Sequence, residues 1–252
     1  MSSSSNGFLP MTDSAVIVLA AGQGKRMQSN LPKPLVPVAG VAILHHLLRS
    51  IEEAGIELVS VVVGHGAEEV RAALSPSIQT PLQETRDGTA HAVSVAHASV
   101  EEAKHVFVFV GDSPLLSAGS IQALAETHAA TGAGCTFLTS DFAKHFPYAR
   151  VVRDGGGRVI ACVEERDCSA EQAAITEYLT SHFLFDGPTL WPLLERVSPH
   201  PVTGERYLTD VIDLMLAEGH GVEAVAIEDW RELVGLNTPE DVAWAEEVLA
   251  NG

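Results

Sequence analysis

The sequence is poor in cysteine and in basic residues, and it contains no long apolar run. Its 252 residues include 3 cysteines, and 15 Lys and Arg stand against 33 Asp and Glu, which gives a formal net charge of -18. No stretch reaches the ~18 consecutive apolar residues that a membrane helix needs. Phosphate backbones and anionic lipid surfaces are bound by basic faces. We therefore expect neither nucleic acid nor a membrane as a partner.

The few cysteines and the polar N-terminus limit where the chain acts. Cys135, Cys162 and Cys168 fit no zinc-site spacing, and their odd number fits no disulfide framework. Free thiols predict a reducing, cytoplasmic location. Residues 1–13 lack the basic start and the apolar stretch of a signal peptide, and we expect them to form a disordered tail. The rest of the chain, 14–252, is long enough for one large domain.

The apolar residues that are present alternate between two periodicities. Short runs rich in β-branched residues, such as 15–20 and 105–110, predict buried strands, and 78–82 predicts a weak one. Apolar residues at helical spacing, as in 41–54, predict helices between them. After about residue 140 a glycine-rich turn indicates a hairpin. The fold class predicted is α/β, with a Rossmann-like, open, mostly parallel sheet flanked by helices and a smaller β-rich portion in the second half.

Basic residues, scarce elsewhere, gather in the glycine-rich loop that follows the first predicted strand. Residues 19–27 read LAAGQGKRM, and LPKPL follows at 31–35. Gly22 and Gly24 lack the side chains that would keep phosphates away from the backbone N–H groups. Arg26 and Lys33 supply charge to neutralise a triphosphate. The string is neither the G-x-G-x-x-G of dinucleotide folds nor an ATPase loop, which ends in Gly-Lys-Ser/Thr.

An acidic side chain follows directly on the predicted strand 105–110. Asp112 stands at the carboxyl end of a parallel strand, where ligands bind in open α/β sheets. A carboxylate oxygen is a hard ligand of the kind that Mg²⁺ takes. The alternative role of Asp112 is to cap a helix or a turn. We favour metal binding.

The loop string resembles the signature of the sugar-1-phosphate nucleotidyltransferases. The resemblance extends over 14–249 and is greatest to the uridylyltransferase domain of the bacterial N-acetylglucosamine-1-phosphate uridylyltransferases. Further motifs of the family occur in its order: Gln83 with GTAHA at 88–92, GDSPL at 111–115, VEE at 163–165, GERYLTD at 204–210 and GLN at 235–237. The resemblance implies Mg²⁺-dependent transfer from UTP to a sugar 1-phosphate, such as N-acetylglucosamine 1-phosphate, with release of pyrophosphate.

The resemblance also implies a role for individual residues in a nucleotidyltransferase domain over 14–252, with a nucleotide half at about 14–140 and a sugar-phosphate half at about 141–252. Nucleotide binding is implied for Leu19, Ala20, Ala21, Gly22, Gln83, Gly88 and Thr89, and sugar-phosphate binding for Ala149, Glu164, Leu179, Tyr207 and Thr209. Arg26 and Lys33 are implied in catalysis, and Asp112 with Asn237 in holding Mg²⁺. The side-chain amide of Gln83 both donates and accepts, as a pyrimidine edge requires. Asn237 has an alternative as a helix cap.

The sugar half departs from the family pattern in two places. Tyr-Gly-Arg is replaced by YAR at 148–150, and Glu-x-Asn-Thr-Gly by EYLTS at 177–181. The methyl group of Ala149 narrows the pocket there, and Leu179 cannot make the hydrogen bond that the family's asparagine makes to the sugar. A missing polar partner costs ~1–3 kcal/mol. The identity of the sugar therefore stays open. Arg86 and Asp87, before Gly88, are also unusual and alter how that loop closes.

Three alternatives remain at this point. The first is a nucleotidyltransferase that uses another nucleoside triphosphate or another phosphorylated acceptor, because the fold alone does not fix the substrate. The second is a non-catalytic nucleotide-sugar sensor, which the presence of Arg26, Lys33 and Asp112 disfavours. The third concerns extent: the short repeats of the acetyltransferase that follows in bifunctional relatives are absent, so the chain is a truncated piece or a standalone transferase. A homo-oligomer is also possible.

Overall fold

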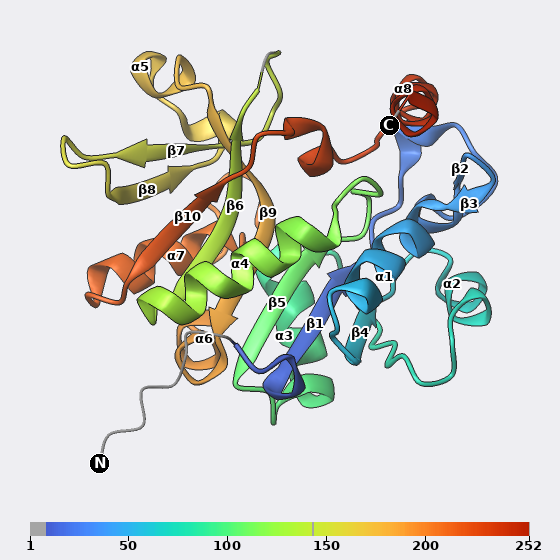
Figure 1. Cartoon of the computed structure of the whole chain (residues 1–252), viewed down its shortest axis with the longest axis horizontal. Coiled ribbons are helices and arrows are strands. Elements are labelled where there is room, and N and C mark those ends of the chain that lie inside the picture. Colours follow the sequence, from blue (N-terminus) through green and yellow to red (C-terminus); the bar gives the residue numbers. More distant parts are fainter. Residues whose placement is uncertain (1–8, 143, 252) are drawn as a thin grey trace.

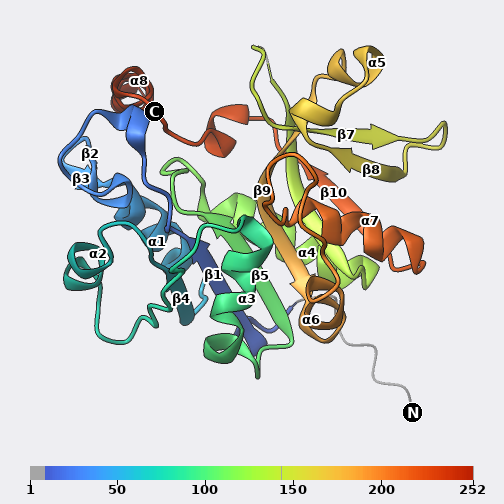
Figure 2. The same cartoon turned by 180° about the vertical axis from the view of Figure 1, so that it is seen from behind.

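The apolar runs of the sequence become the central strands of one mixed sheet in the computed structural model, which describes residues 9–142 and 144–251. β1 (Ser14–Leu19) and β5 (His105–Val110) pair in parallel and are buried, because helices cover both of their faces (Figures 1 and 2). The strand order is β10-β6-β9-β5-β1-β4, with β7 and β8 attached through β9. The other strands of this sheet are β4 (Leu58–Val62), β6 (Cys135–Asp141), β7 (Ala149–Arg153), β8 (Val159–Val163), β9 (Glu177–Asp186) and β10 (Val222–Ala226). A separate two-stranded sheet consists of β2 (Pro37–Val38) and β3 (Val41–Ala42).

One strand from the second half of the chain lies in the middle of the sheet. β9 runs antiparallel to both of its neighbours, β5 and β6, whereas β1 with β4 and β6 with β10 are parallel pairs. The α/β class with a mostly parallel sheet is thereby confirmed. Because β9 separates strands of the first half, the nucleotide and sugar halves predicted from the sequence share one sheet.

Helices cover both faces of this sheet and enclose two apolar clusters. α1 and α4 lie on one face and α3, α6 and α7 on the other, as the two opposite views show (Figures 1 and 2). α4 is bounded by a Ser117 side chain that accepts from the Ser120 N–H and by Gly132 in the left-handed conformation. The helices are α1 (Ile43–Glu53), α2 (Ala67–Ala73), α3 (Thr89–Val100), α4 (Ala118–Thr131), α5 (Ala170–Ala173), α6 (Gly187–Leu194), α7 (Thr209–Ala217) and α8 (Pro239–Asn251). None of those described is long and apolar enough to cross a membrane.

Two local predictions need correction. Residues 9–13 were expected in a disordered tail, but Leu9 is buried and Met11–Asp13 forms a short 3-10 helix. The Asp13 carboxylate pairs with the Lys104 ammonium at 2.7 Å, which fixes this segment beside β5. Residues 1–8 lie outside the described residues. The predicted strand 78–82 forms only two isolated bridges to the β4 edge, because Pro81 has no N–H to donate.

Candidate active site

A cavity of about 200 Å³ opens at the carboxyl ends of β1 and β5, where the glycine-rich loop begins. This is the edge at which open α/β sheets bind ligands. Six of the seven residues predicted to bind the nucleotide line it, together with Lys33 and Asp112. The six are Leu19, Ala20, Ala21, Gly22, Gly88 and Thr89. The prediction that these residues share one pocket therefore agrees with the geometry, while their binding of a nucleotide stays a prediction.

Gly24 determines where the lysine of this loop lies. It has a left-handed backbone (φ 60°), and a Cβ atom built on it would be 2.5 Å from Lys33 Cβ. Only glycine permits both the conformation and so close an approach. The loop is therefore packed on the aliphatic stem of Lys33, whose side chain is 12% exposed.

Three residues from distant parts of the sequence meet at the head of this lysine. The Lys33 ammonium is ion-paired with Asp112 Oδ2, and it donates a hydrogen bond of 2.8 Å to Asn237 Oδ1. Charge-assisted bonds of this kind are the stronger ones in proteins. The structure thus brings together one residue predicted to act in catalysis and both residues predicted to hold Mg²⁺.

The carboxamide of Asn237 is held in place, and it does not cap the helix that follows. Asn237 Nδ2 donates to the Gly235 carbonyl at 2.9 Å. α8 is instead capped by a reciprocal pair, in which Thr238 N–H donates to Asp241 Oδ2 and Asp241 N–H donates to Thr238 Oγ1. The capping alternative for Asn237 is therefore wrong. Its side-chain oxygen instead accepts from the Lys33 ammonium.

The donor set at this point suits a small divalent cation. Asp112 and Asn237 offer a carboxylate and an amide oxygen, which are hard ligands, and both oxygens already hold a cation in the Lys33 ammonium. A Cβ on Gly235 would stand 2.8 Å from Asp112 Oδ1, so a larger residue there would displace the Asp112 carboxylate from its present position. In the described part of the chain no group of three or more His, Cys, Asp or Glu could hold a metal. Phosphate oxygens or water would have to complete the coordination of Mg²⁺.

A second cavity, of about 150 Å³, adjoins the first and shares Val110 and Asp112 with it. Its apolar wall is formed by Ala149 and Leu179, which are paired across β7 and β9 and are both buried. Glu164 and Asn237 also line it. Three of the five residues predicted to bind the sugar phosphate, Ala149, Glu164 and Leu179, therefore belong to one cavity.

The wall of this second cavity is held by a buried cation and an aromatic cluster. The Arg150 side chain is fully buried, is ion-paired with Glu165, and has its guanidinium carbon 4.3 Å from the centre of the Tyr178 ring. A buried guanidinium without such partners would be costly. Tyr148 stacks on Phe146 with ring centroids 5.5 Å apart. These contacts fix the segment that presents Ala149.

Ser181, also in the cavity lining, holds a backbone conformation that favours glycine. Its φ is 64°, and the pairing of β9 with β6 shifts register between Phe137 and Thr139 at this level. A left-handed non-glycine residue costs roughly 1–2 kcal/mol. The position is the last of the EYLTS segment, where the family pattern has glycine.

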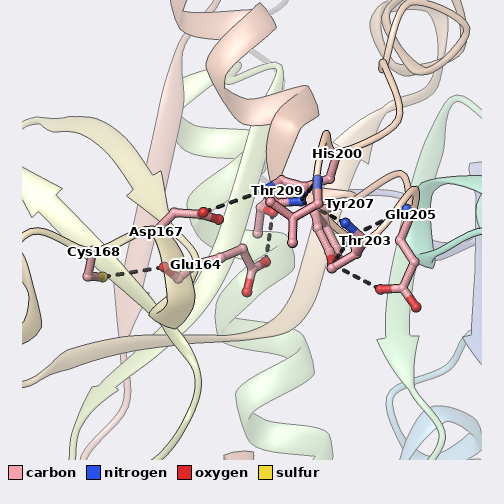
Figure 3. A network of polar contacts seen from close by, with 9 residues as sticks. Glu164, Asp167, Cys168, His200, Thr203, Glu205, Tyr207 and Thr209 are labelled. Atoms are coloured by element: carbon pink, nitrogen blue, oxygen red, sulfur yellow. Dashed lines mark hydrogen bonds and ion pairs between the residues drawn. The ribbon is translucent and has the colours of Figure 1, made fainter.

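The side chain of Glu164 is held in a network of polar contacts (Figure 3). Thr209 Oγ1 donates to Glu164 Oε1 at 2.9 Å, and burial raises the pKa of the Glu164 carboxyl, although this hydrogen bond opposes the rise. Tyr207 donates its hydroxyl to Glu205 Oε2 at 2.9 Å and lies beneath the Arg166 guanidinium. Neither Thr209 nor Tyr207 lines the cavity. In this arrangement Thr209 positions Glu164, and Tyr207 orders the neighbouring loop.

Two other predicted residues also lie outside the cavity linings. Gln83 is buried, and its Nε2 donates to the Gly88 carbonyl at 3.1 Å and lies 3.2 Å from His91 Nδ1. It therefore shapes the turn at Gly88, and its reading of a base stays a prediction. Arg26 is exposed and has no carboxylate within ion-pairing distance among the residues that the structure describes.

Two further residues of this site, Tyr148 and Gly235, are not predicted from the sequence to act in it. Tyr148 accepts a hydrogen bond of 3.1 Å from the Gly235 N–H, and burial raises the pKa of its hydroxyl to about 12. It thus ties the second cavity to the segment that carries Asn237. Both Tyr148 and Gly235 belong to motifs quoted above, YAR and GLN, but a contact between them is a property of the fold.

Comparison with known proteins agrees with this geometry. Residues 16–225 match the model of the MobA-like NTP transferase domain family. Relatives named "Bifunctional protein GlmU" are 39% identical in Staphylococcus haemolyticus (92% of this chain, 52% of the relative), 40% in Heliobacterium modesticaldum (92% and 51%) and 40% in Streptomyces coelicolor (93% and 50%). The chain spans about half the length of these curated relatives. Because the family model covers most of the chain, the chain belongs to the MobA-like NTP transferase domain family, as the predicted resemblance to nucleotidyltransferases required.

Proposed function

We propose that this domain transfers a uridylyl group from UTP to a sugar 1-phosphate, either N-acetylglucosamine 1-phosphate or a related sugar, in a reaction that depends on Mg²⁺. The observation that carries the proposal is the meeting of Lys33, Asp112 and Asn237 where the two cavities adjoin. The family match and the similarity to proteins named GlmU support nucleotidyl transfer to a sugar phosphate.

The shared wall of the two cavities determines how the reaction would run. UTP would occupy the cavity of the glycine-rich loop, and the acceptor the one lined by Glu164 and Leu179. An oxygen of the sugar phosphate then attacks the α-phosphorus beside Asp112, a new O–P bond forms, and the bond to the pyrophosphate oxygen breaks. The attacking phosphate carries its own negative charge, so no general base is required.

Catalysis in this scheme rests on positioning and on charge neutralisation. Mg²⁺ held by Asp112 and Asn237 would supply the divalent charge that stabilises the reacting phosphates. Lys33 would move from these two oxygens to the phosphate chain, which its stem can reach from the loop. Arg26, exposed at the end of the same loop, would bind the phosphates from the solvent side.

A panel assay tests the proposal. Pyrophosphate release is measured with Mg²⁺ for UTP, dTTP, CTP, ATP and GTP, each against a set of sugar 1-phosphates. Turnover with UTP and at least one sugar 1-phosphate, with the matching UDP-sugar as product, is the expected result. Preference for another nucleotide would contradict the uridylyl assignment, and nucleotide binding without release from any pair would favour a sensor.

A further inference from the structure

Arg86 links two loops that line the cavity assigned to the nucleotide. It belongs to the segment before α3, and its Nη1 donates a hydrogen bond of 3.1 Å to Gln23 Oε1 in the glycine-rich loop. Gly22, next to Gln23, and Gly88, two residues after Arg86, both line the cavity. The side-chain contact therefore joins two loops that each contribute a residue to the lining of the cavity.

The backbone that carries Arg86 is fixed from behind. Arg206 N–H donates to the Asp87 carbonyl at 2.7 Å, and Ala90 N–H donates to the Arg206 carbonyl at 3.0 Å. Gly88 has φ 99°, and a Cβ on it would lie 2.2 Å from the Arg206 carbonyl oxygen. Such close packing leaves the loop little freedom at its base, so the guanidinium is held beside the glycine-rich loop.

Among the residues that the structure describes, no acidic side chain is paired with Arg86. Its side chain is exposed, and no carboxylate of the described chain lies within ion-pairing distance, although the protein has 33 acidic residues. The nearest carboxylate in the sequence, Asp87, instead accepts from Thr85 Oγ1 at 3.0 Å. An arginine whose only side-chain partner is a neutral amide is available for an anion, and its planar fork matches two phosphate oxygens.

We propose that Arg86 is a nucleotide-binding residue whose guanidinium exchanges Gln23 for the terminal phosphates of the bound triphosphate. This inference rests on the proposed function. The reacting phosphorus would lie beside Asp112, at the wall shared with the second cavity, whereas Arg86 contacts the glycine-rich loop that is assigned to the phosphates, so the phosphates it would meet are those that leave as pyrophosphate. Arg86 thereby selects a triphosphate over a monophosphate.

Binding of UTP and of UMP, measured by calorimetry with Mg²⁺ on the full chain, tests the inference. Loss of one charge-assisted contact should weaken UTP binding about 10- to 100-fold in Arg86→Ala, and Arg86→Lys should restore part of it. UMP affinity should change less than about twofold, because UMP lacks the terminal phosphates. Arg49→Ala, which removes an exposed arginine of α1, is the matched control and should bind UTP as the wild type does.

A second variant separates phosphate binding from a purely structural link between the loops. Gln23→Ala removes the partner of Arg86 and leaves the guanidinium in place, so it should lower UTP affinity much less than Arg86→Ala. Equal losses in the two variants, or an unchanged Arg86→Ala, would overturn the inference and leave the proposed function standing. A wild-type protein that binds no UTP would overturn both.

Discussion

Removal of the Lys33 ammonium should strengthen the binding of a divalent cation to the nucleotide-free protein. The ammonium is bonded to both Asp112 and Asn237, the two oxygens that the proposal assigns to the metal. A divalent ion and an ammonium about 4 Å apart repel each other by roughly 8 kcal/mol at an effective dielectric constant of about 20. The two therefore cannot share these oxygens, and the metal must first displace Lys33.

The magnitude follows from the bonds that are lost. A hydrogen bond to a charged group is worth about 1.5–3 kcal/mol net, and the displaced ammonium regains water, so one such bond is a fair estimate of the cost. Lys33→Ala should then bind Mn²⁺, an oxygen-seeking probe that is visible by electron paramagnetic resonance, about 10- to 100-fold more tightly. Lys25→Ala is the matched control, because it removes an exposed charge from the same loop. Equal affinity in the wild type and both variants, or weaker binding in Lys33→Ala, would refute the reasoning.

Three further changes test the acceptor cavity. Leu179→Asn should raise the ratio of kcat/KM for N-acetylglucosamine 1-phosphate to kcat/KM for glucose 1-phosphate by about tenfold or more, because a polar partner there is worth ~1–3 kcal/mol. If this ratio is unchanged, Leu179 does not face the sugar. Burial raises the folded-state pKa of Glu164 above its ordinary 4.5, so the folded protein binds more protons than the unfolded chain above that pH and its stability falls as pH rises. The melting temperature of Glu164→Gln should therefore be higher than that of the wild type at pH 7, and this difference should disappear toward pH 4.5. A difference in melting temperature that does not change with pH would contradict this. Ser181→Gly should raise the free energy of unfolding in urea by about 1 kcal/mol, because it relieves the left-handed strain, and a loss of stability would show that the serine side chain outweighs the strain.

The parts of the site that are local in sequence could be predicted. The apolar residues of β1, the glycines of the following loop and the acidic residue after β5 each belong to a short continuous stretch of sequence, and each pattern has a direct physical meaning. Lys33, Asp112 and Asn237 were recognised separately through motifs, and the fold brings them together. Parallel strands place their carboxyl ends at one edge, which is why such residues converge.

Other features depend on contacts between distant segments, which periodicity does not encode. The apolar pattern of β9 is that of a buried strand, but nothing in it specifies an antiparallel position between β5 and β6. The link from Arg86 to Gln23 and the hydrogen bond from Gly235 to Tyr148 join residues far apart in the chain. The prediction of a disordered tail is wrong at 9–13, because the burial of Leu9 depends on a surface supplied by the rest of the domain.

The most direct test of the central claim is the rate of Mg²⁺-dependent UDP-sugar formation after removal of the Asp112 carboxylate. Asp112→Ala should lower the rate by about 10²–10³-fold or more, by analogy with the loss of one preorganised group that stabilises the transition state. Asp154→Ala, in the β7–β8 turn away from both cavities, is the control and should keep the wild-type rate. A folded Asp112→Ala enzyme as active as the wild type would contradict the assignment of the Lys33–Asp112–Asn237 junction as the catalytic centre.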